Sequence, residues 1–574
     1  MKRKLIFKRF FSLLLSSAVC VGTFSFSAPQ TSYASTNDKN VYYELTDDIQ
    51  DGVILHCFDW TYQQIIDELP NIAAAGFSSI QTSPAQTAVV GNSIWYYLYQ
   101  PNNFTVGNSG LGSESDLQRL CTEADRYGIH VIVDVVANHL AGDHSNIDDS
   151  LKDSQYWHHY GGSINYSNRY EITHGDIGMP DINSEHSYVQ QKVHNYINQL
   201  KSDGVDGIRW DAAKHISLPS ESCNFWNAVI DDDLYNYGEI LDTPVKDNTS
   251  LANSLMSEYT DYMSVTDSVY SGNVLDAFNK GNVPTSYANW TTVNGIDNDE
   301  VVYWAESHDT YSNNTDEGGW TKYINQNTID RAYAVVASRD GASALYFSRP
   351  GQTNKTSIMV GQKGSTHFKS SEVTAVNHFH NACNGEADYY TTSDNVAVVT
   401  RKSGAVLVLG NGSNRQVSVP NSGSYTTPGT YVDEISGNIF TVTADTISGT
   451  IGSTGIAVFY KLDDNPVTDM ITVYFTNNQN WGDVYAYTWG GTTNTSSWPG
   501  NKMTYVKTNE YGESVYKMEI AADVSGLIFT NGNGTKTVDI KTDIKNNNGY
   551  YLTSSGSTCT VGTYTYTNYF TTII

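Results

Sequence analysis

The feature that most constrains the fold is a unit that recurs over roughly 300 residues: an amphipathic helix, a glycine stop and a short apolar strand. In one copy, Leu117, Leu120 and Ala124 lie at helical spacing, Gly128 ends the run, and residues 130–136 are apolar on both faces. Such alternation is typical of a parallel sheet covered by helices. The candidate strands lie near residues 53–58, 78–82, 130–137, 205–210, 235–240, 263–267, 301–306 and 342–347.

Eight such strands predict an α/β fold that closes into a (β/α)8 TIM barrel. Residues 140–180 interrupt the pattern after the third strand, and their Gly, His, Asn and Asp content predicts a small inserted excursion domain. Beyond residue 382, short strands with Gly/Asn/Ser turns predict an antiparallel β-sandwich and then a second all-β module. The expected organisation is a signal peptide at 1–34, the barrel with its insert at 35–382, the sandwich at 383–462 and the module at 463–574.

The N-terminus has the pattern of an export signal. Basic residues at 1–9 precede a mostly apolar stretch, and Ser32-Tyr-Ala34 offers small residues before a cut. Val19 stands before Cys20 where a lipid-attachment site needs a small residue, which favours full secretion over a lipid anchor. No later segment reaches the length of a membrane span. We therefore expect a secreted, extracellular protein without membrane contact after cleavage.

The net charge and the cysteine content argue against a nucleic-acid-binding protein, a disulfide-rich protein and a cysteine-ligated zinc protein. The formal net charge is −28, and negative charge of this size repels phosphate backbones, so nucleic acid is not an expected partner. Beyond residue 34 the chain has five scattered cysteines, which fit neither a disulfide framework nor a zinc site. The 41 tyrosines suit flat, uncharged ligands, although many aromatic residues must belong to the cores. We expect the chain to act as a monomer.

Four predicted strands end in polar residues, and strand ends form the active face of this architecture. The segments are Asp134-Val-Val-Ala-Asn-His139, Gly207-Ile-Arg-Trp-Asp211, Tyr237-Gly-Glu239 and Ala305-Glu-Ser-His-Asp309. Arg209 and Asp211 are two residues apart and share a strand face, where the guanidinium favours the ionised form of the carboxylate. A lone Arg-x-Asp is more often a structural ion pair. Paired carboxylates without a phosphate loop or a Ser/His elbow indicate glycoside hydrolysis.

The four segments, in this order and at these distances, resemble the signature regions of the α-amylase family, glycoside hydrolase family thirteen. Asp206-Gly-Ile-Arg-Trp-Asp-Ala-Ala-Lys-His215 and Glu306-Ser-His-Asp309 are especially similar to amylases of the Bacillus subtilis type. The resemblance spans residues 50–460. It implies that Asp211 is the nucleophile, Glu239 the general acid/base and Asp309 a third carboxylate that stabilises the transition state.

The resemblance also implies substrate contacts around the reacting sugar. The positions that match are Tyr96, Tyr99, Gln100, His139, Arg209, Lys214, His215 and His308. Taken alone, the loop Trp95-Tyr-Tyr-Leu-Tyr-Gln100 would be read as an ordinary aromatic cluster.

Calcium is the implied cofactor. Asn138 and Asp181 would bind it through their side chains, and Thr173 and His215 through backbone carbonyls. The match before Asp181 needs a one-residue gap, which makes Thr173 the weakest member of this set. A chloride requirement is doubtful, because Ser307 stands where chloride-dependent relatives have asparagine.

The C-terminal module resembles the starch-binding modules of carbohydrate-binding family twenty-six. Tyr485 and Tyr487 share a strand face, and Trp498 in a Trp-Pro-Gly turn would complete an aromatic cradle for glucose rings. Some of the aromatic residues nearby must form the module's core.

These observations predict a secreted endo-acting α-amylase that hydrolyses internal α-1,4-glucosidic bonds of starch and related α-glucans with retention of configuration. One alternative is a non-catalytic starch-binding or adhesion protein on an amylase scaffold, against which the presence of all three carboxylates argues. A second is a maltogenic or transglycosylating relative, which a product profile from amylose would separate.

Overall fold

The computed structural model describes residues 45–88, 94–107, 110–285, 296–341, 343–461, 470–490, 498–509, 511–521, 524–542, 544–545 and 547–566. The proposed signal peptide and the segment 462–469, between the sandwich and the module, lie outside the described residues. In the part of the chain that is described, no helix is both long and apolar enough to cross a membrane.

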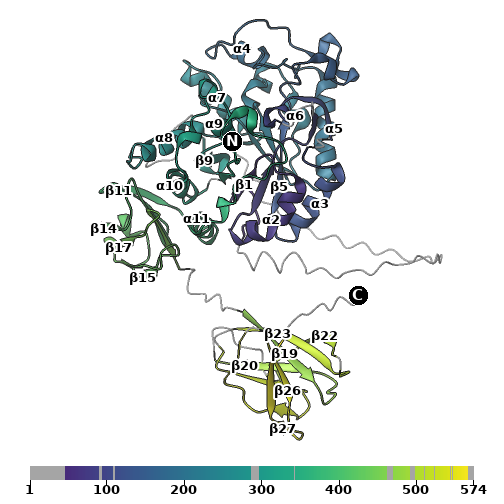
Figure 1. The fold of residues 1–574 in the computed structure, drawn as a ribbon, viewed down its shortest axis with the longest axis vertical. Coiled ribbons are helices and arrows are strands. Elements are labelled where there is room, and N and C mark those ends of the chain that lie inside the picture. Colours follow the sequence, from purple (N-terminus) through teal and green to yellow (C-terminus); the bar gives the residue numbers. More distant parts are fainter. Residues whose placement is uncertain are drawn as a thin grey trace, which may run out of the picture.

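Eight parallel strands close into a barrel, which confirms the predicted fold (Figure 1). Going round the barrel, the order is β1-β10-β9-β8-β7-β6-β5-β2. The strands are β1 (Val53–Cys57), β2 (Ser79–Thr82), β5 (His130–Val136), β6 (Gly207–Asp211), β7 (Tyr235–Gly238), β8 (Ser264–Thr266), β9 (Val301–Trp304) and β10 (Ser343–Phe347).

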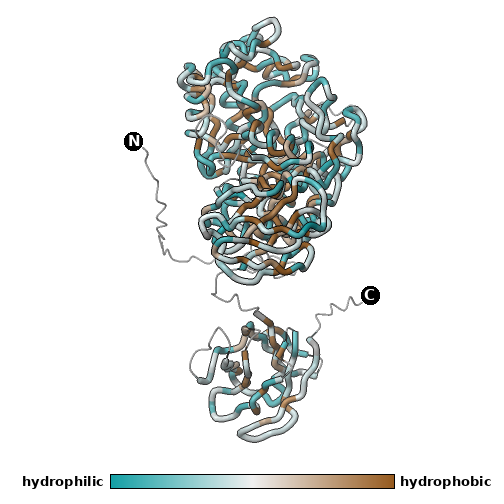
Figure 2. Tube along the Cα trace, turned by 90° about the vertical axis from the view of Figure 1, so that its left-hand side faces the viewer, coloured by the Kyte–Doolittle hydropathy of each residue, from teal (hydrophilic) through white to brown (hydrophobic). Residues whose placement is uncertain are grey.

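Helices cover the outside of the barrel, and their apolar faces pack on the strands. They are α2 (Tyr62–Ala74), α3 (Glu114–Asp125), α5 (Ser187–Ser202), α6 (Phe225–Val229), α7 (Thr249–Tyr259), α8 (Ser268–Asn279), α10 (Gln326–Ala337) and α11 (Ser371–Ala382). The short helix α9 (His308–Ser312) instead follows the carboxyl end of β9. The stripe predicted on α3 is buried, and Ser113 caps its first turn by accepting from the Asp116 N–H. Figure 2 shows apolar residues gathered in the interior and polar residues on the outer loops.

The excursion lies between β5 and α5 and contains little regular structure. It holds three short 3-10 helices, η2 (His144–Asn146), η3 (Asp149–Leu151) and η4 (Ser154–Tyr156), and the helix α4 (Arg169–His174). Arg169 fastens it to the barrel: its guanidinium makes two contacts with Glu221, at 2.9 and 3.0 Å, and donates to the Tyr259 hydroxyl at 2.8 Å. A two-stranded sheet of β3 (Gln86–Ala88) and β4 (Pro101–Val106) lies beside the β2 end.

The sandwich that follows the barrel has two four-stranded antiparallel sheets. One contains β11 (Tyr389–Ser393), β12 (Val396–Thr400), β13 (Gly404–Leu409) and β18 (Ile456–Tyr460); the other contains β14 (Arg415–Pro420), β17 (Thr446–Ile451), β16 (Ile439–Val442) and β15 (Gly429–Val432). Val399, Val406 and Val458 belong to the same apolar cluster as the barrel. Arg331 of α10 donates to the carbonyls of Leu409, Gly412 and Thr454.

The C-terminal module is a second sandwich with its own apolar core. Its first sheet has the order β22 (Thr504–Thr508), β23 (Ser514–Ala521), β19 (Met470–Asn477), β26 (Asn548–Leu552) and β28 (Val561–Thr565). Its second sheet contains β21 (Asn501–Lys502), β20 (Tyr485–Trp489), β24 (Gly526–Thr530), β25 (Lys536–Thr537) and β27 (Thr558–Cys559). The tyrosine- and threonine-rich tail contributes β28, whereas residues 567–574 lie outside the described part.

Candidate active site and metal-binding residues

A cleft of about 740 Å³ lies at the carboxyl ends of the barrel strands. Its lining includes ten of the residues predicted to act on the substrate: Tyr96, Tyr99, Gln100, His139, Asp211, Lys214, His215, Glu239, His308 and Asp309. They come from segments far apart in the sequence, and the barrel brings them together because parallel strands end on one face.

Arg209 lies beneath the cleft and joins three carboxylates. Its Nη1 donates to Asp134 Oδ1 at 2.9 Å and to Asp211 Oδ1 at 2.8 Å, and its Nη2 lies 3.0 Å from Glu239 Oε2. The register of β5 with β6 sets this arrangement, since Asp134 pairs with Arg209. All four side chains are almost completely buried.

Burial and the Arg209 charge act on the pKa of Asp211 in opposite directions. Burial raises the pKa of Asp211 to about 6, although the Arg209 charge opposes this. Burial also raises the pKa of Asp134, to about 7. The Arg209 charge favours the ionised form of Asp211, as expected, but three carboxylates share this guanidinium, and the effect of burial outweighs it.

Two backbone features hold Glu239 in place. Ala212, directly after the nucleophile candidate, has a left-handed backbone with φ of 49°, and its N–H donates to Glu239 Oε2 at 3.0 Å. Gly238 packs so closely that an added Cβ would lie 2.5 Å from Met263 Sδ and 2.9 Å from Ala213 Cβ. A side chain at residue 238 would therefore displace the strand end that carries Glu239.

Aromatic rings and histidines form one side of the cleft. Tyr99 stacks on His308 with ring centroids 5.2 Å apart, and its hydroxyl donates to Asp134 Oδ2 at 2.9 Å. His139 Nε2 donates to the Tyr99 carbonyl at 3.0 Å. Burial and the neighbouring Arg209 charge lower the pKa of His308 to about 3, so this ring is neutral. Tyr99 is only 7% exposed, so only a small part of this residue faces the cleft.

Asp309 lies in the first turn of α9 and accepts from Asn313 Nδ2 at 2.9 Å. Ser307 caps this short helix by accepting from the Thr310 N–H. On the opposite side, Lys214 Nζ donates to the Leu241 carbonyl at 2.9 Å and lies 5.1 Å from the centre of the Tyr166 ring. Burial lowers the pKa of this lysine.

The residues predicted to hold calcium lie where the excursion meets the barrel. An isolated β-bridge between His139 and Asp181 places Asn138 next to Asp181, and His215 Nδ1 donates to the Ile172 carbonyl at 2.8 Å, beside Thr173. Asp181 Oδ1 and Asn138 Nδ2 are buried and make no hydrogen bond with the residues described. A buried, unpartnered carboxylate oxygen beside an amide that can turn its oxygen inward fits a hard cation.

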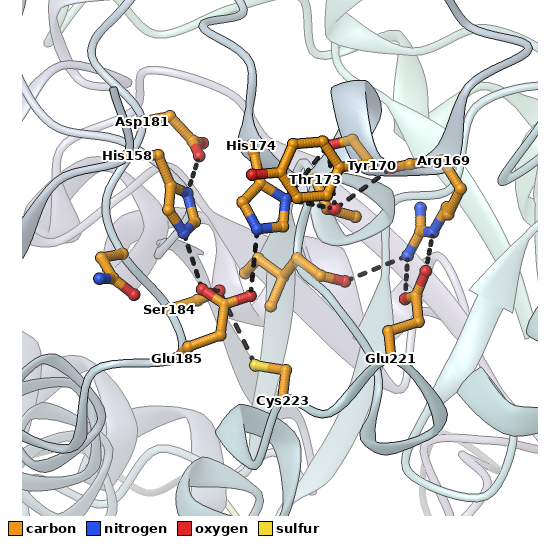
Figure 3. Close-up of polar contacts among 12 residues, drawn as sticks. His158, Arg169, Tyr170, Thr173, His174, Asp181, Ser184, Glu185, Glu221 and Cys223 are labelled. Carbon is orange, nitrogen blue, oxygen red and sulfur yellow. Dashed lines mark hydrogen bonds and ion pairs between the residues drawn. The ribbon is translucent and has the colours of Figure 1, made fainter. Parts of the chain in front are cut away.

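A cluster outside the predicted set lies beside these residues (Figure 3). His158 bridges two carboxylates, with Nδ1 2.5 Å from Asp181 Oδ2 and Nε2 2.7 Å from Glu185 Oε2. His174 Nε2 lies 3.8 Å from Glu185 Oε1. No sequence pattern predicts this cluster, because its members come from a loop, from the end of the six-residue helix α4 and from the turn before α5, which no shared period relates.

The three residues of the predicted aromatic cradle lie on one face of the C-terminal module. Tyr485 and Tyr487 project from β20 away from the core, to which Ala486 between them belongs. The Tyr487 and Trp498 rings lie 5.5 Å apart, and Trp498 is 51% exposed. Sequence reasoning missed Trp489, which continues the same face with its ring 6.2 Å from that of Tyr487. Its spacing of two residues from Tyr487 was the available signal.

Comparisons with known families agree with this geometry. The family model described as alpha amylase, catalytic domain, matches residues 31–290, and the model of starch-binding module 26 matches residues 473–542. An α-amylase of Clostridium acetobutylicum is 34% identical over 456 residues, covering 75% of this chain and 56% of that protein. An α-amylase of Butyrivibrio fibrisolvens is 27% identical, covering 88% of this chain and 66% of that protein. The chain thus spans less than two thirds of the length of either relative.

Solved structures share the fold at low sequence identity. The maltohexaose complex of an Eisenia fetida α-amylase I mutant has a TM-score of 0.60 at 18% identity and covers 72% of this chain and 97% of its own. A γ-cyclodextrin glucanotransferase from an alkalophilic Bacillus clarkii has a TM-score of 0.59 at 15% identity and covers 86% of this chain and 83% of its own. From the family models and the curated relatives, residues 31–290 belong to the α-amylase catalytic-domain family of glycoside hydrolases and residues 473–542 to the starch-binding module 26 family.

Proposed function

We propose that this protein is an endo-acting α-amylase that hydrolyses internal α-1,4-glucosidic bonds of starch with retention of configuration. The observation that carries the proposal is that Asp211 and Glu239 are fixed on one guanidinium at the base of an open cleft. An open cleft admits the middle of a long chain, whereas a closed pocket would accept only an end.

The first step uses both carboxylates. Asp211 Oδ1 accepts from Arg209, so Oδ2 is the oxygen that attacks the anomeric carbon. Glu239 Oε2 is held by the Ala212 N–H and Arg209, so the transferable proton belongs on Oε1. As the glycosidic bond breaks, Glu239 protonates the leaving oxygen and a covalent glycosyl ester forms on Asp211.

In the second step Glu239 acts as a base. It takes a proton from water, which attacks the same carbon and releases the sugar from Asp211 with the α configuration restored. Asp309, His308 and His139 lie around the cleft, where they bind sugar hydroxyls, and the neutral His308 can donate without adding charge.

The proposal is tested by measuring reducing ends released from soluble starch. Glu239→Gln keeps the shape of the side chain and removes the transferable proton, so kcat should fall by about 10²–10⁴-fold with the fold unchanged. Equal, near-zero activity of the native chain and this variant, combined with retained starch binding, would favour the non-catalytic alternative.

The early product profile from amylose distinguishes an endo-hydrolase from maltogenic or transglycosylating relatives. Mixed maltooligosaccharides support hydrolysis within the chain. Cyclic or disproportionated products, or maltose alone, would reassign the activity without changing the roles of the three carboxylates.

Calcium is the proposed structural cofactor. Asn138 and Asp181 would supply side-chain oxygens, and Thr173 and His215 backbone carbonyls, which suits the oxygen preference of this ion. The unpartnered Asp181 Oδ1 supports this assignment. When bound, calcium would neutralise the buried carboxylate and pin the excursion to the barrel beside the cleft.

We further propose that the protein is secreted and acts as a monomer on neutral α-glucans. The basic and apolar residues before position 35 support export. An uncharged polysaccharide does not repel the acidic chain, so the negative net charge is compatible with this substrate. The module's aromatic face supports attachment to starch.

A further inference from the structure

His158 and His174 of the excursion converge on Glu185, just before α5 (Figure 3). None of the three lines the catalytic cleft. One ligand atom from each lies within 4.8 Å of the others. The residues come from three separate segments: the loop after η4, the last position of α4, and the turn that enters α5.

Each histidine has its second ring nitrogen already oriented by an acceptor. His158 Nδ1 lies 2.5 Å from Asp181 Oδ2, and His174 Nδ1 lies 3.1 Å from the Tyr170 carbonyl. Metal-binding histidines generally donate their other N–H to a carboxylate or a backbone carbonyl, which fixes the ring and the tautomer. Both rings therefore present Nε2 to the same carboxylate, Glu185. His158 Nε2 is at hydrogen-bond distance from Oε2, 2.7 Å, so a metal ion would displace the Nε2 proton and move these two atoms apart.

The contact between His174 and Glu185 points to a cation. His174 Nδ1 lies 2.9 Å from Thr173 Oγ1 and 3.1 Å from the Tyr170 carbonyl. In the tautomer with its proton on Nδ1, a neutral His174 turns the lone pair of Nε2 toward Glu185 Oε1 at 3.8 Å. Two acceptors that face each other repel unless a positive charge lies between them. In a tetrahedral zinc site, with bonds of about 2.0–2.2 Å, neighbouring ligand atoms lie about 3.4 Å apart, close to this separation.

We propose that His158, His174 and Glu185 bind a zinc-class transition-metal ion, with water completing the coordination. Two imidazoles and one carboxylate suit zinc, whereas calcium and magnesium prefer oxygen ligands alone. Asp181 then has two separate tasks: Oδ2 orients His158, and Oδ1 remains available for the calcium proposed above. The zinc site itself does not depend on that calcium assignment.

The metal would join the loop that carries His158, helix α4 and the entry to α5. Arg169 already ties α4 to the barrel through Glu221, so the new site would brace the other end of the same short helix. Its expected effect is to stabilise the excursion, which supplies one wall of the substrate cleft through Tyr166 and residues 177–179.

The test uses the full chain purified with excess calcium, dialysed against zinc and analysed for bound metal. We expect one zinc ion per wild-type chain and none in His174→Ala. His159→Ala is the matched control, because this neighbouring histidine points to the Ser154 carbonyl, outside the cluster, and its zinc content should be unchanged. Equal zinc content in wild type and His174→Ala, or zinc-free wild type, would overturn the proposal.

Cobalt substitution separates this site from metal held by the catalytic carboxylates. Co²⁺ on two imidazoles and a carboxylate in tetrahedral geometry gives intense visible absorption, whereas carboxylate and water ligands in octahedral geometry give weak bands. We expect the intense spectrum in wild type and in Glu239→Gln, and its loss in Glu185→Gln, which keeps the side-chain shape if His174→Ala does not fold. A weak spectrum in wild type, or an intense one retained in Glu185→Gln, contradicts the assignment.

Discussion

Asp134 and Asp211 accept hydrogen bonds from the same nitrogen of Arg209, at 2.9 and 2.8 Å. Asp134 has no contact with the cleft, and it competes with Asp211 for one positive charge. The charge state of Asp211, the proposed nucleophile, therefore depends in part on a carboxylate that does not line the cleft.

Replacing Asp134 with Asn should shift the pH profile. The variant keeps the side-chain shape and leaves Arg209 to the two catalytic carboxylates, so the pKa of Asp211 falls. The acid limb of kcat/KM should move to lower pH by roughly one unit. A profile of kcat/KM against pH with a soluble maltooligosaccharide measures this, and a shift toward higher pH would contradict the shared-charge explanation.

In the native chain the acid limb of kcat/KM should have an apparent pKa near 6. Asp211 must be ionised to attack, and its pKa is raised to about 6, so activity falls as the pH drops through this value. The same rate profile should be found with substrates of different chain length, since the group belongs to the free enzyme. An acid limb near 4 would show that the burial effect is smaller than described.

The free energy of unfolding should change with pH in the direction opposite to the change in kcat/KM. Asp134 and Asp211 have folded-state pKa values of about 7 and 6, above the ordinary 3.8, so the folded chain binds protons more tightly than the unfolded chain. Their contribution to the free energy of unfolding is present at low pH and is lost as pH rises from about 4 to 7. Comparing urea unfolding of wild type and Asp134→Asn over this range isolates the effect, because the variant should lose part of the slope.

Gly238→Ala should damage catalysis more than stability. The new methyl group would meet Met263 and Ala213 and displace Glu239, and a misplacement of about 1 Å costs about 10²-fold in rate. Gly272→Ala is the control, because a Cβ at that position in α8 meets nothing within 4 Å and should leave kcat unchanged. Steady-state kinetics on both variants decide, and equal kcat values would show that the strand end adjusts.

Trp498→Ala should weaken adsorption to granular starch while leaving hydrolysis of soluble substrates intact. Truncating one exposed aromatic anchor costs about 2 kcal/mol, or about 30-fold in affinity. Tyr505→Ala serves as the matched control, because this exposed tyrosine lies on the other sheet of the module. Binding isotherms on starch granules measure the difference. Equal losses of affinity in both variants would contradict the assignment of the starch-binding face to β20 and Trp498.

Calcium removal should lower Tm, and Asp181→Asn should abolish that response. At a hundredfold excess over its Kd, a structural ion stabilises the folded state by about 2.7 kcal/mol. Thermal unfolding with and without a calcium-selective chelator, in wild type and variant, gives the comparison. A chelator-sensitive Asp181→Asn chain would place the ion elsewhere.

The barrel and its principal site were predictable because both follow from strand periodicity. Arg209 and Asp211 had to share a face, and Glu239 had to end the adjacent strand, once β6 and β7 were recognised. The pattern did not show that a third carboxylate, that of Asp134, shares the Arg209 guanidinium with Asp211 and Glu239. Asp134 lies in the middle of an apolar strand, and only the register of β5 against β6 shows that it meets Arg209.

The excursion was predictable as an insertion, but its internal contacts were not. His158 and Glu185 are 27 residues apart in irregular chain, where no period relates one side chain to another. In the module, Tyr487 was identified and Trp489 was not, although the same alternation places both on one face.

Arg331 and the valines of β12, β13 and β18 make the barrel and the sandwich one body in energetic terms. Cutting the chain after α11 would expose the apolar surface of the barrel that packs on the sandwich. It would also leave the Arg331 guanidinium without its carbonyl partners. The boundary near residue 383 therefore marks a change from α/β to antiparallel β architecture, but it is not a suitable point for swapping domains between proteins. In a chimeric protein, the barrel and the sandwich should be transferred together.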